Sequence, residues 1–171
     1  MTEPVIRDER PEDAAAVRAI EVGAFGQPGE ADLVDALRAE PGVVSLVAES
    51  DGVLVGHLLL SPVTVEGTST WKALALGPMA VTPSQQRSGI GSALVEASLK
   101  RAQSEGVPAV IVLGHPEYYP RFGFVPAAPH GFHCKWEVPS EVYRVALLDA
   151  ARVATLGGGF VRYHSAFDGV T

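Results

Sequence analysis

Residues 86–91 of this 171-residue chain combine glycines, a fixed cation and the start of a helix. The segment reads Gln-Arg-Ser-Gly-Ile-Gly and stands between an apolar run and a helical pattern. Backbone N–H groups in the first turn of a helix have no helical acceptor, and the helix dipole adds partial positive charge there. Gly89 and Gly91 let a bulky anion approach the backbone, and Arg87 adds a positive charge. The segment therefore predicts a pyrophosphate-binding loop.

Two common pyrophosphate-binding loops are excluded by the residues that follow. A nucleoside-triphosphate loop ends in Gly-Lys-Ser or Gly-Lys-Thr, whereas Gly91 is followed by Ser92 and Ala93. The dinucleotide loop needs a third glycine where this chain has Leu94, and it needs a βαβ unit at the N-terminus, which the pattern does not predict. The loop therefore holds its anion in another structural context.

A buried strand and an amphipathic helix are expected to position the loop. Residues 74–81 are apolar and too few to span a membrane. Gly77-Pro78 within them predicts a bulge or an edge, because proline cannot donate to a ladder; the alternative is a strand that ends at Leu76. The helix is expected to end near Gly106. Its inward face gathers Leu94, Val95, Ser98, Leu99 and Ala102.

A second motif follows the next apolar run. Residues 109–113 predict a strand parallel to residues 74–81, connected through the helix. Pro-Glu-Tyr-Tyr-Pro-Arg-Phe-Gly-Phe comes directly afterwards at residues 116–124. The two motifs thus lie on consecutive strand ends of one β-α-β unit, where ligand sites of α/β proteins are usually found.

Together the motifs resemble the GNAT (Gcn5-related) N-acetyltransferase superfamily. Gln86-x-x-Gly89-x-Gly91 is similar to its acyl-CoA-binding motif, and Tyr119-x-x-x-Gly123-Phe124 to a motif after its fifth strand. The fuller second motif resembles one bacterial subgroup, and the resemblance covers residues 74–124. It implies acetyl-CoA as cosubstrate, held by the strand end and the loop. The cofactor-binding residues so implied are Met79, Ala80, Val81, Gln86, Arg87, Ser88, Gly89, Ile90, Gly91, Ser92 and Ala93.

The activity that the resemblance implies is direct transfer of acetyl from the thioester to a primary amine. An N–H of Ala80 or a neighbour would stabilise the oxyanion. Tyr119 would protonate the leaving thiolate, since a phenol stays protonated at neutral pH; Tyr118 is the fallback, and a purely structural Tyr119 is the alternative. The sequence does not identify the general base. It could be a water chain or one of four side chains: Glu49, His57, His115 and Glu117. A CoA-binding regulatory or pseudo-enzyme domain without turnover is the alternative function.

The amino-acid composition limits the classes of partner that the protein is expected to bind. A net charge of −7 argues against general affinity for nucleic acid, which needs a basic stripe. The absence of an 18-residue apolar segment and of a signal-peptide pattern predicts a cytoplasmic protein without membrane contact. A single cysteine, Cys134, and scattered histidines predict no metal site. The expected partner is a small-molecule or peptide amine, and the expected state is a monomer or homodimer.

The chain length predicts one domain, residues 1–171, of the α/β (α+β) class. GNAT proteins imply a mixed, mostly antiparallel sheet of six to seven strands flanked by about four helices. Helices are expected near residues 12–24 and 30–39, with Arg18 and Glu21 on the solvent side of the first, and a hairpin turns at Asp51-Gly52. Further strands are expected near residues 5–7, 142–148 and 160–163. By resemblance, the acceptor site borders on Phe25, Gln27 and Glu30.

Overall fold

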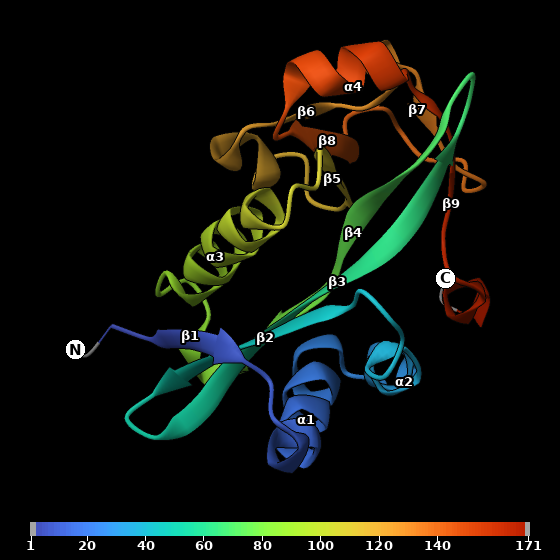
Figure 1. Cartoon of the computed structure of the whole chain (residues 1–171). Coiled ribbons are helices and arrows are strands. Elements are labelled where there is room, and N and C mark those ends of the chain that lie inside the picture. Colours follow the sequence, from blue (N-terminus) through green and yellow to red (C-terminus); the bar gives the residue numbers. More distant parts are fainter. Residues whose placement is uncertain (1–2, 170–171) are drawn as a thin grey trace. The chain divides into compact units, whose positions relative to one another are not determined.

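The computed structural model describes residues 3–169, which form two compact units. Within the described residues, unit 1 comprises 3–61, 77–98 and 165–169, and unit 2 comprises Pro62–Leu76 and Leu99–His164. Among the described residues, nine strands follow the order β1-β2-β3-β4-β5-β8-β6, with β9 paired to β3 and β7 paired to β9 (Figure 1). The strands β3 (Val53–Glu66) and β4 (Thr70–Val81) contribute residues to both units.

Unit 1 is an antiparallel sheet with helices packed on it. The strand β1 (Val5–Asp8) pairs with β2 (Val44–Ser50), and β2 pairs with the first half of β3. The helices α1 (Ala14–Phe25) and α2 (Gly29–Leu37) pack on the sheet through two apolar clusters. These clusters are Val17, Val34 and Val47, and Leu33, Leu37 and Leu59.

The start of α3 (Ile90–Ser104) packs on the other face of the same sheet. A Cβ added to Gly56 of β3 would lie 3.0 Å from the side chains of both Ile90 and Leu94. A larger residue at position 56 would therefore push the first turn of α3 away from the strand. Because successive side chains of a strand alternate between faces, His57 points to the side that α1 and α2 cover.

Unit 2 contains an apolar core between short strands. The strand β5 (Ala109–Leu113) pairs in parallel with residues 74–76 of β4 and antiparallel with β8 (Tyr143–Leu147). β8 also pairs with β6 (Phe124–Pro126), and β9 (Gly159–Arg162) pairs with the end of β3 and with β7 (Phe132–His133). The core includes Val65, Trp71, Ile111, Phe132, Val145 and Val161.

The elements agree with the sequence predictions except in the C-terminal third. The α/β class, the mostly antiparallel sheet, the parallel β4–β5 pair and the helix ending before Gly106 are confirmed. The strand through Gly77-Pro78 continues to Val81, so the alternative of an end at Leu76 is wrong. The nine strands exceed the six to seven expected, because β6 and β7 have three and two residues, too few for a periodic pattern.

The helix α4 (Ala150–Leu156) was not predicted. Only Val153 is buried among its seven residues, so the segment shows no amphipathic pattern. The start of the helix is marked in the sequence by its N-cap residue, Asp149, whose Oδ1 accepts a hydrogen bond from the N–H of Arg152 at 3.1 Å. None of the helices in the described part of the chain has the length and hydropathy needed to cross a membrane.

Candidate functional site

The predicted phosphate loop lies in unit 1, between the end of β4 and the first turn of α3. A 3-10 turn, η2 (Pro83–Gln85), begins the connection. Gln86 Nε2 donates to the carbonyl oxygen of Val81 at 3.0 Å, and Ser88 Oγ donates to that of Gln85. Both bonds fold the loop back on the strand end, so the Gln86 side chain shapes the loop rather than serving an anion through its amide nitrogen.

The backbone of the loop alternates in a way that suits an anion. Arg87 has φ +64° and Gly89 has φ +89°, both in the left-handed region, which costs a non-glycine residue about 1–2 kcal/mol. Residues 86–89 are exposed, and a Cβ added to Gly89 would meet no atom within 4 Å. Residues in the left-handed region can turn backbone N–H groups toward one concave side, as in anion-binding loops. The loop therefore presents donors and the Arg87 charge to solvent at a helix start.

The first turn of α3 divides the remaining predicted residues. Ile90 is buried against Gly56 of β3, so its side chain anchors the helix while its backbone closes the loop. The N–H of Ala93 donates to the carbonyl oxygen of Gly89 at 3.0 Å, which commits that amide to the helix. Gly91 and Ser92, in the first turn of α3, are partly buried.

The strand before the loop has a defined amide direction. Thr82 N–H donates to the carbonyl oxygen of Val55 at 2.8 Å, toward β3. Since amides alternate along an extended strand, Ala80 N–H also points toward β3, whereas those of Met79 and Val81 point to the opposite edge. The geometry thus favours Met79 and Val81, the neighbours of Ala80, as amide donors to a ligand strand. Within this strand, the Gly77-Pro78 peptide is cis and Gly77 has φ +139°.

Tyr119 lies in unit 2, at the start of the 3-10 turn η3 (Tyr119–Phe122). Its ring is buried and makes edge contacts with Tyr118 at 5.2 Å and Phe124 at 5.5 Å between centroids. A Cβ added to Gly114 would lie 2.7 Å from the Tyr119 ring, so Gly114 makes room for it. Burial, with a smaller contribution from Tyr118, raises the pKa of the Tyr119 phenol above its ordinary value. The phenol therefore stays protonated through the neutral range.

The four open base candidates have different surroundings. His57 is fully buried, with Ser45 Oγ 2.8 Å from Nε2 and Glu21 Oε2 2.7 Å from Nδ1. Glu49 pairs with Arg7 at 3.2 Å in unit 1. His115 and Glu117 are exposed in unit 2.

Glu21 is a residue that the sequence prediction misplaced. It was expected on the solvent side of the first helix, but it has no exposed surface and contacts His57. The spacing contained the signal, since Val17, Ile20 and Glu21 stand at positions i, i+3 and i+4 of one helical face. An acidic residue type favours exposure, but a buried carboxylate is stable when it is paired, as Glu21 is with His57.

The expected acceptor-site residues lie where α1 meets α2. Phe25 is 43% exposed, and Gln27 Nε2 donates to Glu30 Oε1 at 3.1 Å. Cys134 of unit 2 is partly buried, with Sγ 3.7 Å from the carbonyl oxygen of Trp136. Among residues 3–169, no group of three His, Cys, Asp or Glu side chains is arranged to hold a metal ion.

Comparison with known proteins gives one family. The model of the acetyltransferase (GNAT) family matches residues 14–124. An uncharacterized N-acetyltransferase of Escherichia coli, YhbS, is 35% identical over 170 residues, covering 96% of this chain and 98% of the relative.

Two solved structures share the fold over nearly the whole chain. The crystal structure of Escherichia coli YhbS in complex with CoA superposes with a TM-score of 0.91 and 32% identity, covering 98% of this chain and 93% of that one. A GNAT family acetyltransferase from Brucella melitensis in complex with acetyl-CoA gives a TM-score of 0.77 and 33% identity, covering 98% and 100%.

Proposed function

The chain belongs to the acetyltransferase (GNAT) family and is an N-acetyltransferase, and we propose that it transfers acetyl directly from acetyl-CoA to a primary amine. The observation that carries this proposal is the loop with Arg87 and Gly89 in the left-handed region before α3. Two similar structures contain CoA and acetyl-CoA, which supports the same ligand here. The loop amides and Arg87 would hold the pyrophosphate, and the first turn of α3 would add its dipole.

Strand β4 would hold the acyl arm. The amides of Met79 and Val81 point away from β3, so they are the donors that an extended pantetheine arm would meet. An N–H in this position also stabilises the oxyanion that forms when an amine attacks the thioester. Holding the two reactants in one orientation lowers the barrier by several kcal/mol, about 7–11 in well-oriented systems.

Tyr119 is the proposed proton donor to the leaving thiolate. Its support is the match to the second motif and the raised pKa, which keeps the phenol protonated at neutral pH. The raised pKa also makes the Tyr119 phenol a weaker acid. Proton transfer from Tyr119 is therefore favourable only once the C–S bond has lengthened and the sulfur carries negative charge.

Both compact units would form one catalytic domain. The family match from residue 14 to residue 124 runs through segments of unit 1 and unit 2 alike, which supports this interpretation. The acceptor would be a small amine or a peptide amine.

Calorimetric titration with acetyl-CoA, CoA and ATP tests the cosubstrate. We expect acetyl-CoA and CoA to bind and ATP to bind at least tenfold more weakly. Release of CoA thiol is then followed with a panel of primary amines: phenethylamine, spermidine, free amino acids and a lysine peptide. Absence of acetyl-CoA binding would contradict the proposal, and turnover of any amine would exclude a domain that only binds CoA.

A further inference from the structure

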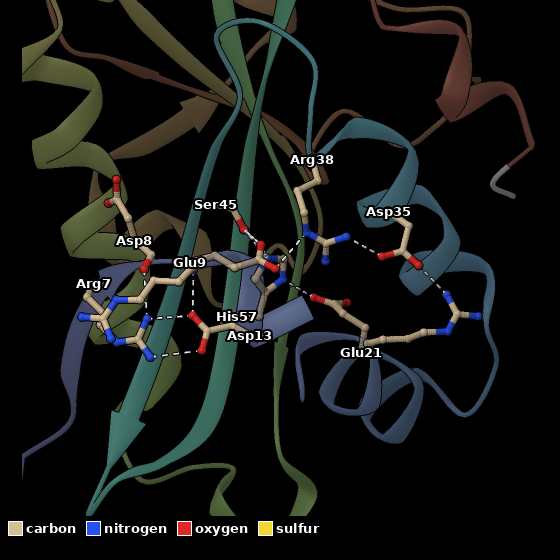
Figure 2. Close-up of polar contacts among 11 residues, drawn as sticks. Arg7, Asp8, Glu9, Asp13, Glu21, Asp35, Arg38, Ser45 and His57 are labelled. Carbon is tan, nitrogen blue, oxygen red and sulfur yellow. Dashed lines mark hydrogen bonds and ion pairs between the residues drawn. The ribbon is translucent and has the colours of Figure 1, made fainter. Parts of the chain in front are cut away.

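Unit 1 contains a buried chain of polar side chains that the reaction above does not use, here called the His57 chain: Glu21, His57, Ser45 and Glu9 (Figure 2). Its links are 2.7 Å between Glu21 Oε2 and His57 Nδ1, 2.8 Å between His57 Nε2 and Ser45 Oγ, and 2.5 Å between Ser45 Oγ and Glu9 Oε1. His57 and Glu21 have no exposed surface, and the side chain of Glu9 is 3% exposed. α1, β3, β2 and the segment after β1 each contribute one member.

A count of hydrogens shows what the His57 chain holds. Each of the three contacts is short enough to need a hydrogen between its heavy atoms. The Ser45 hydroxyl brings one and a neutral imidazole brings another, whereas an ionised carboxylate brings none. One further proton fills the third contact.

The two ends of the His57 chain differ. Oε1 of Glu21 is buried and has no hydrogen-bond partner among the described residues, and the same holds for Ser61 Oγ, four residues after His57 on β3. A buried carboxylate oxygen without a partner is costly and therefore a strong acceptor for a ligand or a water molecule. At the other end, Glu9 meets Arg38, which is 26% exposed and also pairs with the half-exposed Asp35 at 2.6 Å.

The Glu21 end lies near the strand proposed to hold the thioester. Thr82 N–H bonds to Val55, and β3 and β4 run in opposite directions through the short turn at residues 67–69, so His57 stands opposite Ala80. α1 passes the end of the same strand, because a Cβ added to Gly23 would lie 4.0 Å from Pro83. Glu21 lies on the same helix and bonds to His57, which is what places its carboxylate near this strand.

We propose that the His57 chain is the proton relay of the acetyl transfer: it removes the proton of the acceptor ammonium at Glu21 and delivers it to solvent at Glu9. The inference rests on the proposed function. Glu21 Oε1 has no exposed surface, so the proposal requires a water molecule to enter beside it and carry the proton from the ammonium. Glu21, His57 and Ser45 are therefore positioning and relay residues that do not touch the substrate.

The proton balance closes. A proton that arrives at Glu21 Oε1 shifts one hydrogen from Oε2 to His57 Nδ1, one from Nε2 to Ser45 Oγ and one from Oγ to Glu9 Oε1. One proton then leaves from Glu9, which empties the contact between Ser45 Oγ and Glu9 Oε1. Before the next turnover the Ser45 hydroxyl must rotate back to Glu9, and the hydrogens of His57 and Glu21 must return to their starting sides. The neutral amine then forms the C–N bond while the C–S bond breaks. The thiolate receives a proton from Tyr119, which regains one from the amide nitrogen, so one proton per turnover leaves through Glu9.

The other charged groups near the His57 chain are paired elsewhere and do not interrupt this route. Arg7 bonds to Asp13 at 2.8 Å (Figure 2) and to Glu49 at 3.2 Å, and Arg18 bonds to Asp32 and Asp35. Glu9 Oε1 also lies 3.9 Å from His57 Nε2. Glu9 therefore receives the proton rather than competing for it.

The test is the pH dependence of kcat in Glu21→Gln, with the best amine of the panel. We expect a loss of about 100-fold at pH 7, where an alkylamine is almost fully protonated. The loss should shrink to less than about threefold at pH 10, where the amine supplies its own neutral form. Acetyl-CoA affinity, measured by calorimetry, should not change.

Two further variants keep the test decisive. Ser45→Ala interrupts the relay without removing Glu21, so it should lose about tenfold at pH 7 and recover at pH 10; it carries the test if Glu21→Gln does not fold. Asp32→Asn, a 63% exposed carboxylate on α2, is the matched control and should keep wild-type rates. A deficit in Glu21→Gln and Ser45→Ala that is equal at both pH values overturns the relay but leaves the transferase intact. A wild-type protein that turns over no amine overturns both proposals.

Discussion

The two halves of strand β3 are buried in surroundings of different polarity. In unit 1 it contributes His57 and Ser61, which are fully buried polar residues, and His57 belongs to a chain with two buried carboxylates. In unit 2 it contributes Val63 and Val65 to a core in which Trp71 and Phe132 meet edge to face at 6.0 Å. In unit 2, polar side-chain contacts next to this core include the hydroxyls of Tyr143 and Tyr163, 3.2 Å apart.

The apolar core of unit 2 and the His57 chain of unit 1 are expected to contribute differently to stability and to function. Apolar burial stabilises by about 25 cal/mol per Å² and needs no partner of defined geometry. Buried ions cost several kcal/mol each in desolvation, and replacing a buried pair by apolar residues is often neutral or stabilising. The proposed relay would give the His57 chain a function that offsets the cost of burying it. The predictions below separate the two interiors.

Phe132→Ala should destabilise the protein by about 3–5 kcal/mol, since Phe132 is 1% exposed and its removal leaves a cavity beside Trp71. Urea denaturation measures the loss. Val125→Ala, at a 36% exposed position of unit 2, should lose less than about 1 kcal/mol. A small effect of Phe132→Ala would mean that the apolar core does not carry the stability of unit 2.

Glu21→Leu should cost about 3 kcal/mol, because it leaves His57 Nδ1 buried without its partner. The double variant Glu21→Leu with His57→Leu should return to within about 1–2 kcal/mol of the wild type while activity at pH 7 stays low. Denaturant unfolding and thiol release give the two readouts. A double variant as unstable as Glu21→Leu alone would show that the His57 chain stabilises the fold.

Tyr119→Phe should lower kcat about 100-fold and leave the affinity for acetyl-CoA unchanged, since only the proton donor is removed. Steady-state kinetics with calorimetry separates these quantities. Tyr163→Phe serves as a matched control in the same unit and should keep its rate. A large loss in Tyr118→Phe with an active Tyr119→Phe would assign the donor role to Tyr118.

Gly89→Ala should weaken acetyl-CoA binding about tenfold, because alanine at φ +89° is strained and its methyl group enters the space of the anion. Gly106 is the matched control: it lies at the other end of α3, has φ +74° and would also meet no atom within 4 Å. Gly106→Ala should lose similar stability and bind acetyl-CoA normally. Equal binding losses in both variants would remove the loop from the site.

Alkaline pH should weaken the apolar interior by a smaller amount. Burial and the neighbouring Tyr163 raise the pKa of Tyr143 above its ordinary value near 10. The neutral phenol therefore stabilises the folded state fully below pH 10, and this stability is lost as the pH rises above 10, by about 0.8 kcal/mol at pH 10.5. Unfolding curves at pH 9 and 10.5 measure the change, which should be smaller in Tyr143→Phe. A difference that is identical in this variant would exclude Tyr143 as its source.

Local patterns were sufficient for the elements that carry the loop. The apolar run ending at Val81, the glycines at 89 and 91 and the helical periodicity that follows act over neighbouring residues, so they could be interpreted without a structure. The helix α4 and the strands β6 and β7 were missed or misjudged because they are short and form through contacts with distant strands.

The sequence by itself determined the family and the sheet class and predicted an anion-binding loop, because each rests on residue types at fixed short spacing. It left the base open among four side chains and placed Glu21 in solvent. Only the tertiary structure joined Glu21, His57, Ser45 and Glu9, whose hydrogen-bonded neighbours are up to 36 residues apart in the sequence. No local pattern marks such a chain, because its partners satisfy one another only after α1, β2 and β3 have packed, and burial then turns ordinary surface residue types into a proton path.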